Sequence, residues 1–264
     1  MTQIAIVGTG RMGTAFAKRL IEVKYTVTVW NRTLSRTTEA AEAGAMVADD
    51  LTSIAKADCI IVSLTDAAAV KAVTAELISV GISSRLVIDM STLLPEDTRT
   101  IGEMISAADA DFVDCPVGGT VGPALKGQLL GMAGGTDAAF ARAKPVLEQL
   151  CRRVEHLGPA GTGAQMKLAV NLPLAIYWQT LAEALNTLEG SGIAAETAIS
   201  LIADSSAGPT VLKNRAQVVI DTLNGTHQPG TFDIAGLAKD LDLALQQAAL
   251  AGRAMPLSEE TRKS

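Results

Sequence analysis

A lysine and an asparagine four residues apart, Lys167 and Asn171, are the side chains of this sequence best suited to act together on one small ligand. On a helix, residues at this spacing lie on the same face, about one turn apart. Their neighbours are apolar, and burial among apolar groups lowers the pKa of a lysine because it penalises the ammonium form. Such a lysine can pass a proton to a substrate oxygen. The alternative is that Lys167 extends to solvent and has no chemical role.

A glycine-rich segment near the amino terminus is a second chemical signature. Residues 4–7 are typical of a buried strand, and a G-x-G-x-x-G spacing follows at once, before a helical pattern over residues 15–21. In this context the first glycine permits a tight turn, the second lets the backbone approach a pyrophosphate, and the third lets the helix pack on the strand. The spacing therefore predicts a dinucleotide site. Its predicted contacts are Gly8, Thr9, Gly10, Arg11, Met12 and Gly13.

The end of the second predicted strand, residues 26–30, indicates which dinucleotide binds. A fold that prefers NAD usually offers an acidic residue here to the ribose hydroxyls, whereas this chain continues with Asn31, Arg32 and Thr33. A neutral residue followed by an arginine can accept a 2′-phosphate. The sequence thus predicts NADP(H), with NAD(H) as the second choice. Arg32 and Thr33 can also simply begin the next helix with Thr33 as its N-cap, and the two roles are compatible.

Polar residues also follow two further predicted strands, residues 59–63 and 86–89. Because the carboxyl ends of parallel strands meet at the edge where such a sheet binds its ligand, we expect cofactor contacts from Leu64, Thr65 and Thr92. Residues of these types at strand ends are often only helix caps, which is the alternative interpretation.

Another glycine-rich loop follows a predicted strand at residues 112–115. Successive glycines leave backbone N–H groups available to form an anion-binding concavity. The loop is therefore a candidate for holding a substrate carboxylate through Gly118, Gly119 and Thr120. The alternative is a loop without a binding role.

The order of predicted elements indicates how these residues are positioned. Strand-like and helical segments alternate as far as a closing strand at residues 151–156, and Gly158 and Pro159 then mark a boundary. Only helical patterns follow, and Pro173 should bend the first of them. We therefore expect an α/β Rossmann-type dinucleotide-binding domain at 1–160, followed by an all-α C-terminal domain at 161–264. The expected helices of the second domain are 163–188, 195–203, 211–223 and 237–251.

Composition narrows the classes of partner. The chain of 264 residues has a formal net charge of −6 and no basic run, which speaks against nucleic acid or an anionic membrane surface. We find no transmembrane-length apolar segment and no signal peptide, and expect a cytoplasmic protein. The three cysteines lack metal-type spacing and are interpreted as reduced packing residues. With only His156 and His227 besides, we expect no metal site.

Several of these motifs, in the same order, resemble the β-hydroxyacid dehydrogenase family, which includes 3-hydroxyisobutyrate dehydrogenase and tartronate semialdehyde reductase. The resemblance covers nearly the whole chain. It implies that Lys167 is the catalytic acid/base, that Asn171 helps to hold the substrate, and that Lys239 lies near the cofactor. The motifs that carry it are Gly8-x-Gly10-x-x-Gly13, Asn31-Arg32-Thr33, Asp89-x-Ser91-Thr92, Asp114-x-Pro116-Val117, Gly161-x-Gly163 through Lys167 to Asn171, and Lys239-Asp240-Leu241.

Two features depart from that family. Its glycine-rich loop usually reads Pro-Val-Ser-Gly-Gly, with the serine binding the substrate acid group, but Gly118 stands at the serine position and Thr120 at the last glycine. The family also usually runs on through another helix after the Lys-Asp-Leu segment. This chain stops at Arg262-Lys263-Ser264. We therefore expect a shortened C-terminus, with the far wall of the site incomplete or supplied by another subunit.

These observations predict an NADP-dependent oxidoreductase that transfers hydride between the nicotinamide and a small aldehyde, keto acid or β-hydroxy acid. One alternative is an imine reductase, which resembles this fold but generally places an aspartate or tyrosine where Lys167 stands. Another is a non-catalytic NADP-binding sensor or structural partner. The apolar surface of the long helix 163–188 and the family resemblance together predict a homodimer or higher homo-oligomer.

Overall fold

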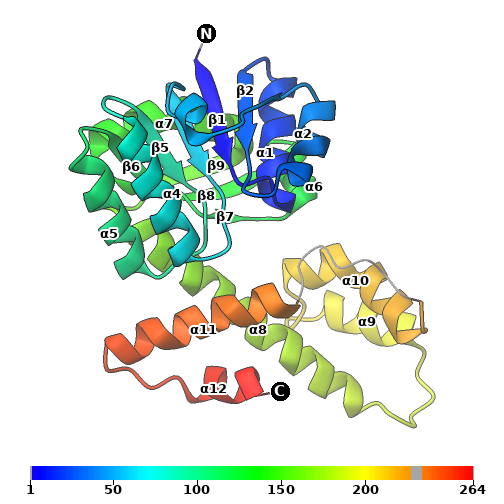
Figure 1. Ribbon diagram of the computed structural model, residues 1–264. Helices are drawn as coiled ribbons and strands as arrows, with labels where there is room; N and C mark the ends of the chain where they lie inside the picture. The colour runs from blue at the N-terminus through cyan, green and yellow to red at the C-terminus, as the bar shows by residue number, and fades with distance from the viewer. Residues whose placement is uncertain (1, 227–233, 264) are drawn as a thin grey trace.

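The computed structural model describes residues 2–226 and 234–263, and within them nine strands form one sheet in the N-terminal part of the chain (Figure 1). The order along the sheet is β3-β2-β1-β4-β5-β6-β8-β7, with β9 beside β8. The strands are β1 (Gln3–Val7), β2 (Thr26–Trp30), β3 (Met46–Val47), β4 (Cys59–Val62), β5 (Leu86–Asp89), β6 (Asp111–Asp114), β7 (Val117–Gly118), β8 (Leu129–Gly135) and β9 (Cys151–His156).

The strands from β1 to β6 are mutually parallel where they pair, whereas β8 runs antiparallel to β6. Alternate residues of β1 enter the two separate hydrophobic clusters of the domain. Ile4 and Ile6 belong to one cluster, and Ala5 and Val7 to the other. Burial on both faces explains why β1, β4 and β5 are largely continuous apolar runs rather than alternating patterns. The carboxyl ends of β1, β2, β4 and β5 consequently share one edge of the sheet.

Helices cover both faces of this sheet. The helix α1 and the long α7 contribute to the cluster around Ile4, while α4 and α5 contribute to the cluster around Val7. Such a layered arrangement is the doubly wound architecture. The helices of this part are α1 (Arg11–Glu22), the 3-10 helix η1 (Leu34–Thr37), α2 (Thr38–Glu42), α3 (Leu51–Ile54), α4 (Ala67–Val80), α5 (Pro95–Ser106), α6 (Val121–Leu125) and α7 (Asp137–Leu150).

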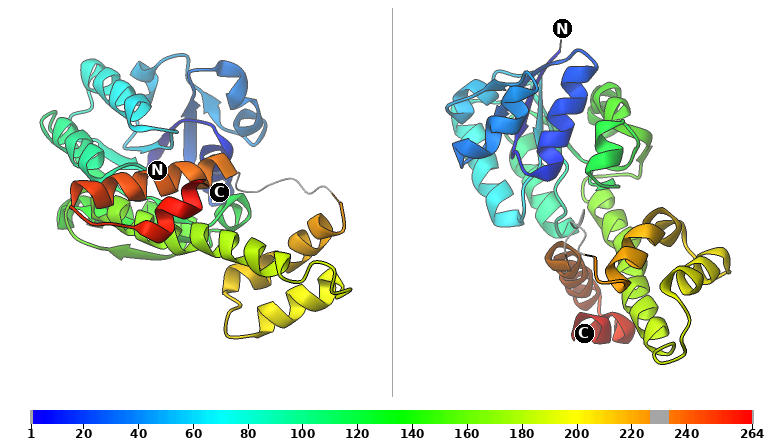
Figure 2. Two further views of the ribbon diagram at one scale, coloured as in Figure 1. Left: turned by 90° about the horizontal axis from the view of Figure 1, so that it is seen from below. Right: turned by 90° about the vertical axis from the view of Figure 1, so that its right-hand side faces the viewer.

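The chain after β9 is helical throughout its described part. Helix α8 leads away from the sheet, with α11 and α12 packed along it, while α9 and α10 lie towards its other end (Figures 1 and 2). The predicted fold class, a Rossmann-type α/β domain followed by an all-α region, is thus confirmed. The helices are α8 (Thr162–Asn186), α9 (Ala195–Asp204), α10 (Thr210–Leu223), α11 (Ile234–Leu250) and α12 (Pro256–Lys263).

Helix α8 contains Pro173, as predicted for the single long helix at 163–188. Other elements differ from the sequence-based expectation. The short strand β7 and the five-residue helix α6 lie inside the segment interpreted as a glycine-rich loop. Helix α12 was not predicted, because its sequence is largely polar and offers no apolar periodicity.

His227 lies outside the described residues. Among the residues that the structure describes, none of the helices combines the length and hydrophobicity needed to cross a bilayer.

Candidate active site

The loop between β1 and α1 has the geometry of a pyrophosphate cradle. Gly8 has a φ of 97°, and a Cβ there would lie 2.3 Å from the carbonyl oxygen of Ser63. A Cβ on Gly13 would lie 1.9 Å from the carbonyl oxygen of Gly8. A Cβ on Gly10, in contrast, would meet nothing within 4 Å. The outer two glycines are therefore required by packing, while the middle one leaves open space in front of the loop.

The residues around this space fit an anionic ligand. Gly10 is the N-cap of α1 and supplies no side-chain hydrogen bond to the first helical N–H groups. Within the described residues, the buried hydroxyl of Thr9 has no hydrogen-bond partner. Arg11 is exposed and Met12 half-buried at the first turn. A helix N-terminus without a side-chain cap from its N-cap residue favours a phosphate group, so the cradle fits a dinucleotide.

Asn31 connects this cradle to the end of β2. Its Oδ1 accepts a hydrogen bond from the Thr9 N–H at 3.2 Å, and its Nδ2 donates to the Thr33 carbonyl oxygen at 2.9 Å. Arg32 and Thr33 are exposed beside it. Thr33 occupies the N-cap position of η1, but its side chain makes no capping hydrogen bond. The three residues thus lie next to the glycine loop, on the outer side of the same sheet edge.

The loops after β4 and β5 are held together by Asp89 and Ser91. Asp89 Oδ1 accepts from the Ser91 N–H at 3.0 Å, and Ser91 Oγ accepts from the Leu64 N–H at 3.0 Å. Burial raises the pKa of Asp89 to about 6. Leu64, Thr65 and Thr92 therefore lie on loops whose backbones are fixed relative to one another.

Lys167 and Asn171 form a buried hydrogen-bonded group with a third residue, Asp240. Lys167 Nζ donates to the Val117 carbonyl oxygen at 2.8 Å and to Asn171 Oδ1 at 3.1 Å. Asn171 Nδ2 donates to Asp240 Oδ2 at 2.6 Å. Only 8% of Lys167, 7% of Asn171 and 4% of Asp240 is exposed. The lysine therefore does not extend to solvent.

The surroundings of Lys167 alter its proton affinity. Burial lowers its pKa below 10.5, and the nearby positive charge of Lys239 acts in the same direction. The negative charge of Asp240 opposes both effects. A buried lysine with a lowered pKa can release and take up a proton more readily than a surface lysine.

Lys239 brings the helical region against the sheet. From α11, its Nζ donates to the carbonyl oxygens of Thr92 at 3.0 Å and of Thr65 at 3.3 Å. It also lies 3.5 Å from Asp240 Oδ1. One continuous chain of polar contacts thus links the loops after β4 and β5 to Asp240, Asn171 and Lys167.

The glycine-rich loop adjoins this group, because Val117 bonds to Lys167 and immediately precedes Gly118. Gly119 has a φ of 122°, and Thr120 is the N-cap of α6 without a side-chain capping bond. A Cβ on Gly118 would meet only Leu130, at an ordinary distance of 3.5 Å. The space for a serine side chain is therefore present, although the hydroxyl itself is absent.

Asp240 is the member of this group that the sequence analysis did not assign. The sequence did contain an indication of its role, because Asp240 follows Lys239 in the Lys-Asp-Leu motif. The two neighbours on α11 face different partners: Lys239 contacts the loops of the sheet, and Asp240 contacts α8.

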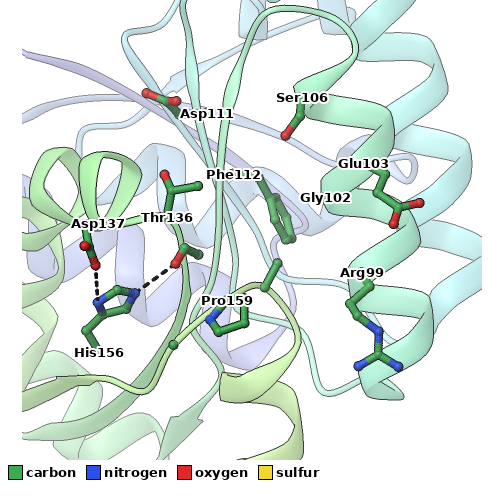
Figure 3. A pocket seen from close by; sticks show the side chains of 13 residues that line it. Arg99, Gly102, Glu103, Ser106, Asp111, Phe112, Thr136, Asp137, His156 and Pro159 are labelled. Atoms are coloured by element: carbon green, nitrogen blue, oxygen red, sulfur yellow. Dashed lines mark hydrogen bonds and ion pairs between the residues drawn. The ribbon is translucent and has the colours of Figure 1, made fainter.

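A separate pocket of about 590 Å³ lies between α5, the start of β6 and the ends of β8 and β9 (Figure 3). His156 stacks on Phe140 there, and its ring nitrogens lie 2.9 Å from the Gly135 carbonyl oxygen and 3.4 Å from Asp137 Oδ1. None of the predicted site residues lines this pocket. The pocket is therefore distinct from the group around Lys167.

Two known families match the chain, and the boundary between the two matches lies where the strands end and the helices begin. Residues 3–158 match the NAD-binding domain of 6-phosphogluconate dehydrogenase. Residues 161–264 match the NAD-binding domain of NADP-dependent 3-hydroxyisobutyrate dehydrogenase. Together the two matches cover nearly all of the sequence.

Individual relatives cover the chain over most of its length. Glyoxylate/succinic semialdehyde reductase 1 of Arabidopsis thaliana is 31% identical over 247 residues, which are 92% of this chain and 84% of that protein. The solved structure of Mycobacterium tuberculosis 3-hydroxyisobutyrate dehydrogenase with L-serine has a TM-score of 0.89 at 28% identity, covering 100% of this chain and 92% of that one.

An imine reductase from a Pseudomonas species shares the fold, with a TM-score of 0.72 at 18% identity over 98% of this chain and 90% of that one. The dehydrogenase similarity is stronger in both sequence and structure. The chain belongs to the β-hydroxyacid dehydrogenase family, related to 3-hydroxyisobutyrate dehydrogenase, and is an NAD(P)-dependent oxidoreductase.

Proposed function

We propose that this protein is an NADP-dependent oxidoreductase that reduces a small aldehyde or keto acid, or oxidises the matching β-hydroxy acid, with Lys167 as general acid/base. The observation that carries this proposal is the buried Lys167 amine with its lowered pKa, joined through Asn171, Asp240 and Lys239 to the dinucleotide edge of the sheet.

Within the part of the chain that the structure describes, the hydrogen bonds of Lys167 leave one of its N–H donors unused. An ammonium group has three N–H donors. The Val117 carbonyl oxygen and Asn171 Oδ1 accept two of them. The third can be directed at a substrate oxygen, where it stabilises developing negative charge and then transfers its proton. Asn171, oriented by Asp240, limits the directions in which this donor can point.

A bound nicotinamide would supply the hydride for this reaction. We propose that the dinucleotide lies against the cradle and the strand-end loops, where the glycine geometry, the unpartnered Thr9 hydroxyl and the uncapped α1 favour its phosphates. The proposed cofactor contacts are Gly8, Thr9, Gly10, Arg11, Met12, Gly13, Asn31, Arg32, Thr33, Leu64, Thr65, Thr92 and Lys239.

We propose NADP(H) over NAD(H) because of the end of β2. Asn31 is engaged with the backbones of Thr9 and Thr33, and no carboxylate stands at its position to receive ribose hydroxyls. The exposed Arg32 can instead pair with a 2′-phosphate through charge-assisted hydrogen bonds.

The substrate is proposed to lie between Lys167 and the loop of Gly118, Gly119 and Thr120, with Asn171 as a further contact. The names of the relatives, a glyoxylate/succinic semialdehyde reductase and 3-hydroxyisobutyrate dehydrogenases, favour a small carbonyl or hydroxy acid. At Gly118 the loop can offer only backbone N–H donors to the acid group.

Gly118 also favours a second candidate, an imine reductase, because that position lacks the hydroxyl expected to bind an acid. Lys167 counts against this candidate, since imine reductases generally carry an aspartate or tyrosine there. A non-catalytic NADP-binding sensor or structural partner is disfavoured by the buried lysine, because burying an amine costs free energy that a binding role does not require.

We further propose a homodimer or higher homo-oligomer. A groove of about 440 Å³ between α8, α11 and α12 is lined by apolar side chains, among them Trp178, Ile234 and Leu237, and by the polar residues Gln179, Thr261, Arg262 and Lys263. Exposed apolar side chains gathered in this way favour association. Sedimentation of the full chain at micromolar concentration tests this, and a monomer there would refute it.

We further propose two domains, at 1–160 and 161–264. This division is supported by the change from strands to helices between His156 and Thr162.

We also propose that the protein is cytoplasmic. The three cysteines, Cys59, Cys115 and Cys151, are buried and unbridged, which favours the reducing environment of the cytoplasm.

One assay tests the enzymatic proposal directly. NADPH oxidation is followed with glyoxylate, succinic semialdehyde, tartronate semialdehyde and cyclic imines as separate substrates. Turnover of the acids supports the proposal, and turnover of imines alone supports the second candidate. A protein that binds NADPH but turns over none of them is a binding protein, and the proposal is then wrong.

A further inference from the structure

A buried carboxylate from the sheet caps the helix that carries Lys167. Asp114, the last residue of β6, is 1% exposed. Its Oδ1 accepts a hydrogen bond from the Gly161 N–H and its Oδ2 from the Ala164 N–H, both at 2.8 Å. Both oxygens of one side chain therefore bond to the start of α8, from almost fifty residues away in the sequence.

Among the described residues, no other side chain caps helix α8 at this end. Its N-cap residue is Gly161, with a φ of 91° and no side chain to accept a hydrogen bond. The helix start is also packed tightly, because a Cβ on Gly163 would lie 2.2 Å from the Met132 carbonyl oxygen and 2.7 Å from Asp114 Oδ2. The two carboxylate bonds thus define where the helix begins relative to β6 and β8.

The same short segment also holds the reactive end of the lysine. Val117, three residues after Asp114, accepts from Lys167 Nζ through its carbonyl oxygen at 2.8 Å. The segment 114–117 therefore contacts α8 at its first residues and again at the Lys167 amine. These contacts lie less than two helical turns apart, so a shift of the helix start would displace the amine from Val117.

We propose that Asp114 is a positioning residue for Lys167. It fixes the axial position and the rotation of α8, so that the amine contacts both Val117 and the reacting oxygen of the substrate. This inference rests on the proposed role of Lys167. It assigns Asp114 no contact with substrate or cofactor, and its effect on turnover passes through the helix alone.

The energetic cost of Asp114 supports a role beyond capping. Burial raises its pKa to about 6 although two N–H groups bond to it, and Asp89, its partner in the register of β5 and β6, raises it further. A helix N-terminus can be capped at a solvent-exposed position without this cost, as Thr136 caps α7. Because Asp114 belongs to β6 and bonds to α8, it fixes the position of the helix relative to the sheet. An exposed cap does not do this.

The test compares Asp114→Asn and Asp114→Glu with Thr136→Val, which removes the side-chain cap of α7 in the N-terminal domain (Figure 3). Asparagine can accept only one of the two bonds, and glutamate moves the carboxylate by one methylene. We expect kcat to fall by about 10²-fold in the Asp114 variants, as for a small misplacement of a catalytic group, with the Kd for NADPH unchanged. Thr136→Val should lose thermal stability but retain kcat.

Two readouts separate positioning from loss of folding. The solvent deuterium isotope effect on kcat should rise in the Asp114 variants, because proton transfer from a displaced amine becomes slower. Acetylation of Lys167, measured by peptide mapping relative to the exposed Lys56, should also accelerate as the amine leaves Val117. If only one of the two Asp114 variants folds, the measurements on that variant decide the test. A folded variant with wild-type kcat, isotope effect and Lys167 acetylation overturns the proposal.

The acetylation readout does not depend on turnover. If the wild-type protein reduces no carbonyl substrate, the proposed function fails, whereas the coupling between Asp114 and the Lys167 amine is still decided by the labelling rates. If the wild type is active and the variants match it throughout, the inference fails and the proposed function stands.

Discussion

Asn171 is oriented by Asp240: its Nδ2 donates to Asp240 Oδ2 at 2.6 Å, which turns the amide oxygen towards Lys167. A carboxylate only accepts hydrogen bonds, so it selects the amide nitrogen and leaves the amide oxygen to the lysine. The three residues therefore act as one unit, in which Asp240 determines both the direction of Asn171 and the charge felt by Lys167.

Removing the charge of Asp240 should change the pH dependence of turnover. Asp240 raises the pKa of Lys167, so Asp240→Asn should lower that pKa. For carbonyl reduction Lys167 must carry its proton, and activity is lost as the pH rises through its pKa. The basic limb of kcat against pH should therefore move to lower pH in the variant.

The matched control for Asp240→Asn is Asp242→Asn on the same helix. The side chain of Asp242 is 41% exposed and pairs with Arg262. Its substitution should leave the profile in place. A basic limb that is identical in wild type and Asp240→Asn would show that the pKa of Lys167 does not govern turnover.

Lys167→Ala tests the proton donor itself. Loss of a general acid typically costs about 10²–10⁴ in rate, and kcat should fall by that amount. The Kd for NADPH should change little, because the dinucleotide cradle lies on the loop after β1. Lys167→Arg should restore little activity, since a guanidinium remains charged and does not readily give up a proton.

Folding is the control for the Lys167 variants, because removing a buried partner of Asn171 can loosen α8. Thermal midpoints close to the wild-type value would exclude that explanation. If folded Lys167→Ala retains wild-type turnover on its best substrate, the acid lies elsewhere and the family assignment holds for fold but not for mechanism.

The sequence predicted those parts of the protein whose signals are local. The close approach of Gly13 to the Gly8 carbonyl oxygen lies within one turn, so the cradle could be predicted from six residues, although the limit on Gly8 itself comes from Ser63. The pairing of Lys167 with Asn171 follows from helical periodicity.

Contacts that depend on tertiary packing could not be predicted in this way. Asn171 and Asp240 are 69 residues apart, and nothing in either local pattern shows that α11 packs on α8. The bond from Ala164 to Asp114 spans 50 residues and has the same character. Helix α12 escaped prediction for the opposite reason, since it has a helix-forming but largely polar sequence without an apolar stripe.

Cofactor preference should depend on Arg32. Arg32→Asp would remove a charge-assisted contact with the 2′-phosphate and add repulsion, so NADPH binding should weaken, while NADH binding changes much less. Losing a hydrogen bond to a charged group corresponds to roughly 1.5–3 kcal/mol, or about 10- to 150-fold in Kd. Dissociation constants for both cofactors measure this. Equal affinity of the unmodified protein for NADH and NADPH would contradict the predicted NADP(H) preference.

The buried Asp89 should make stability depend on pH in a characteristic direction. Its pKa is about 6 in the folded protein, against an ordinary value of 3.8, because burial disfavours the charged form. Between about pH 4 and pH 6 the folded state therefore keeps a proton that the unfolded chain has released. A folded state that binds more protons loses stability as the pH rises, and each pKa unit corresponds to about 1.4 kcal/mol.

Asp89→Asn isolates this effect, because an amide does not titrate and its oxygen can still accept from the Ser91 N–H. The free energy of unfolding of the wild type, minus that of the variant, should fall by roughly 2 kcal/mol between pH 4 and pH 7. Asp114 titrates in both proteins, and its contribution differs only because the charge of Asp89, which raises the pKa of Asp114, is lost in the variant. Urea unfolding at several pH values across this range provides the measurement. A difference that stays constant with pH would show that Asp89 is already ionised at pH 4 in the folded protein, and that the bonds from Ser91 outweigh its burial.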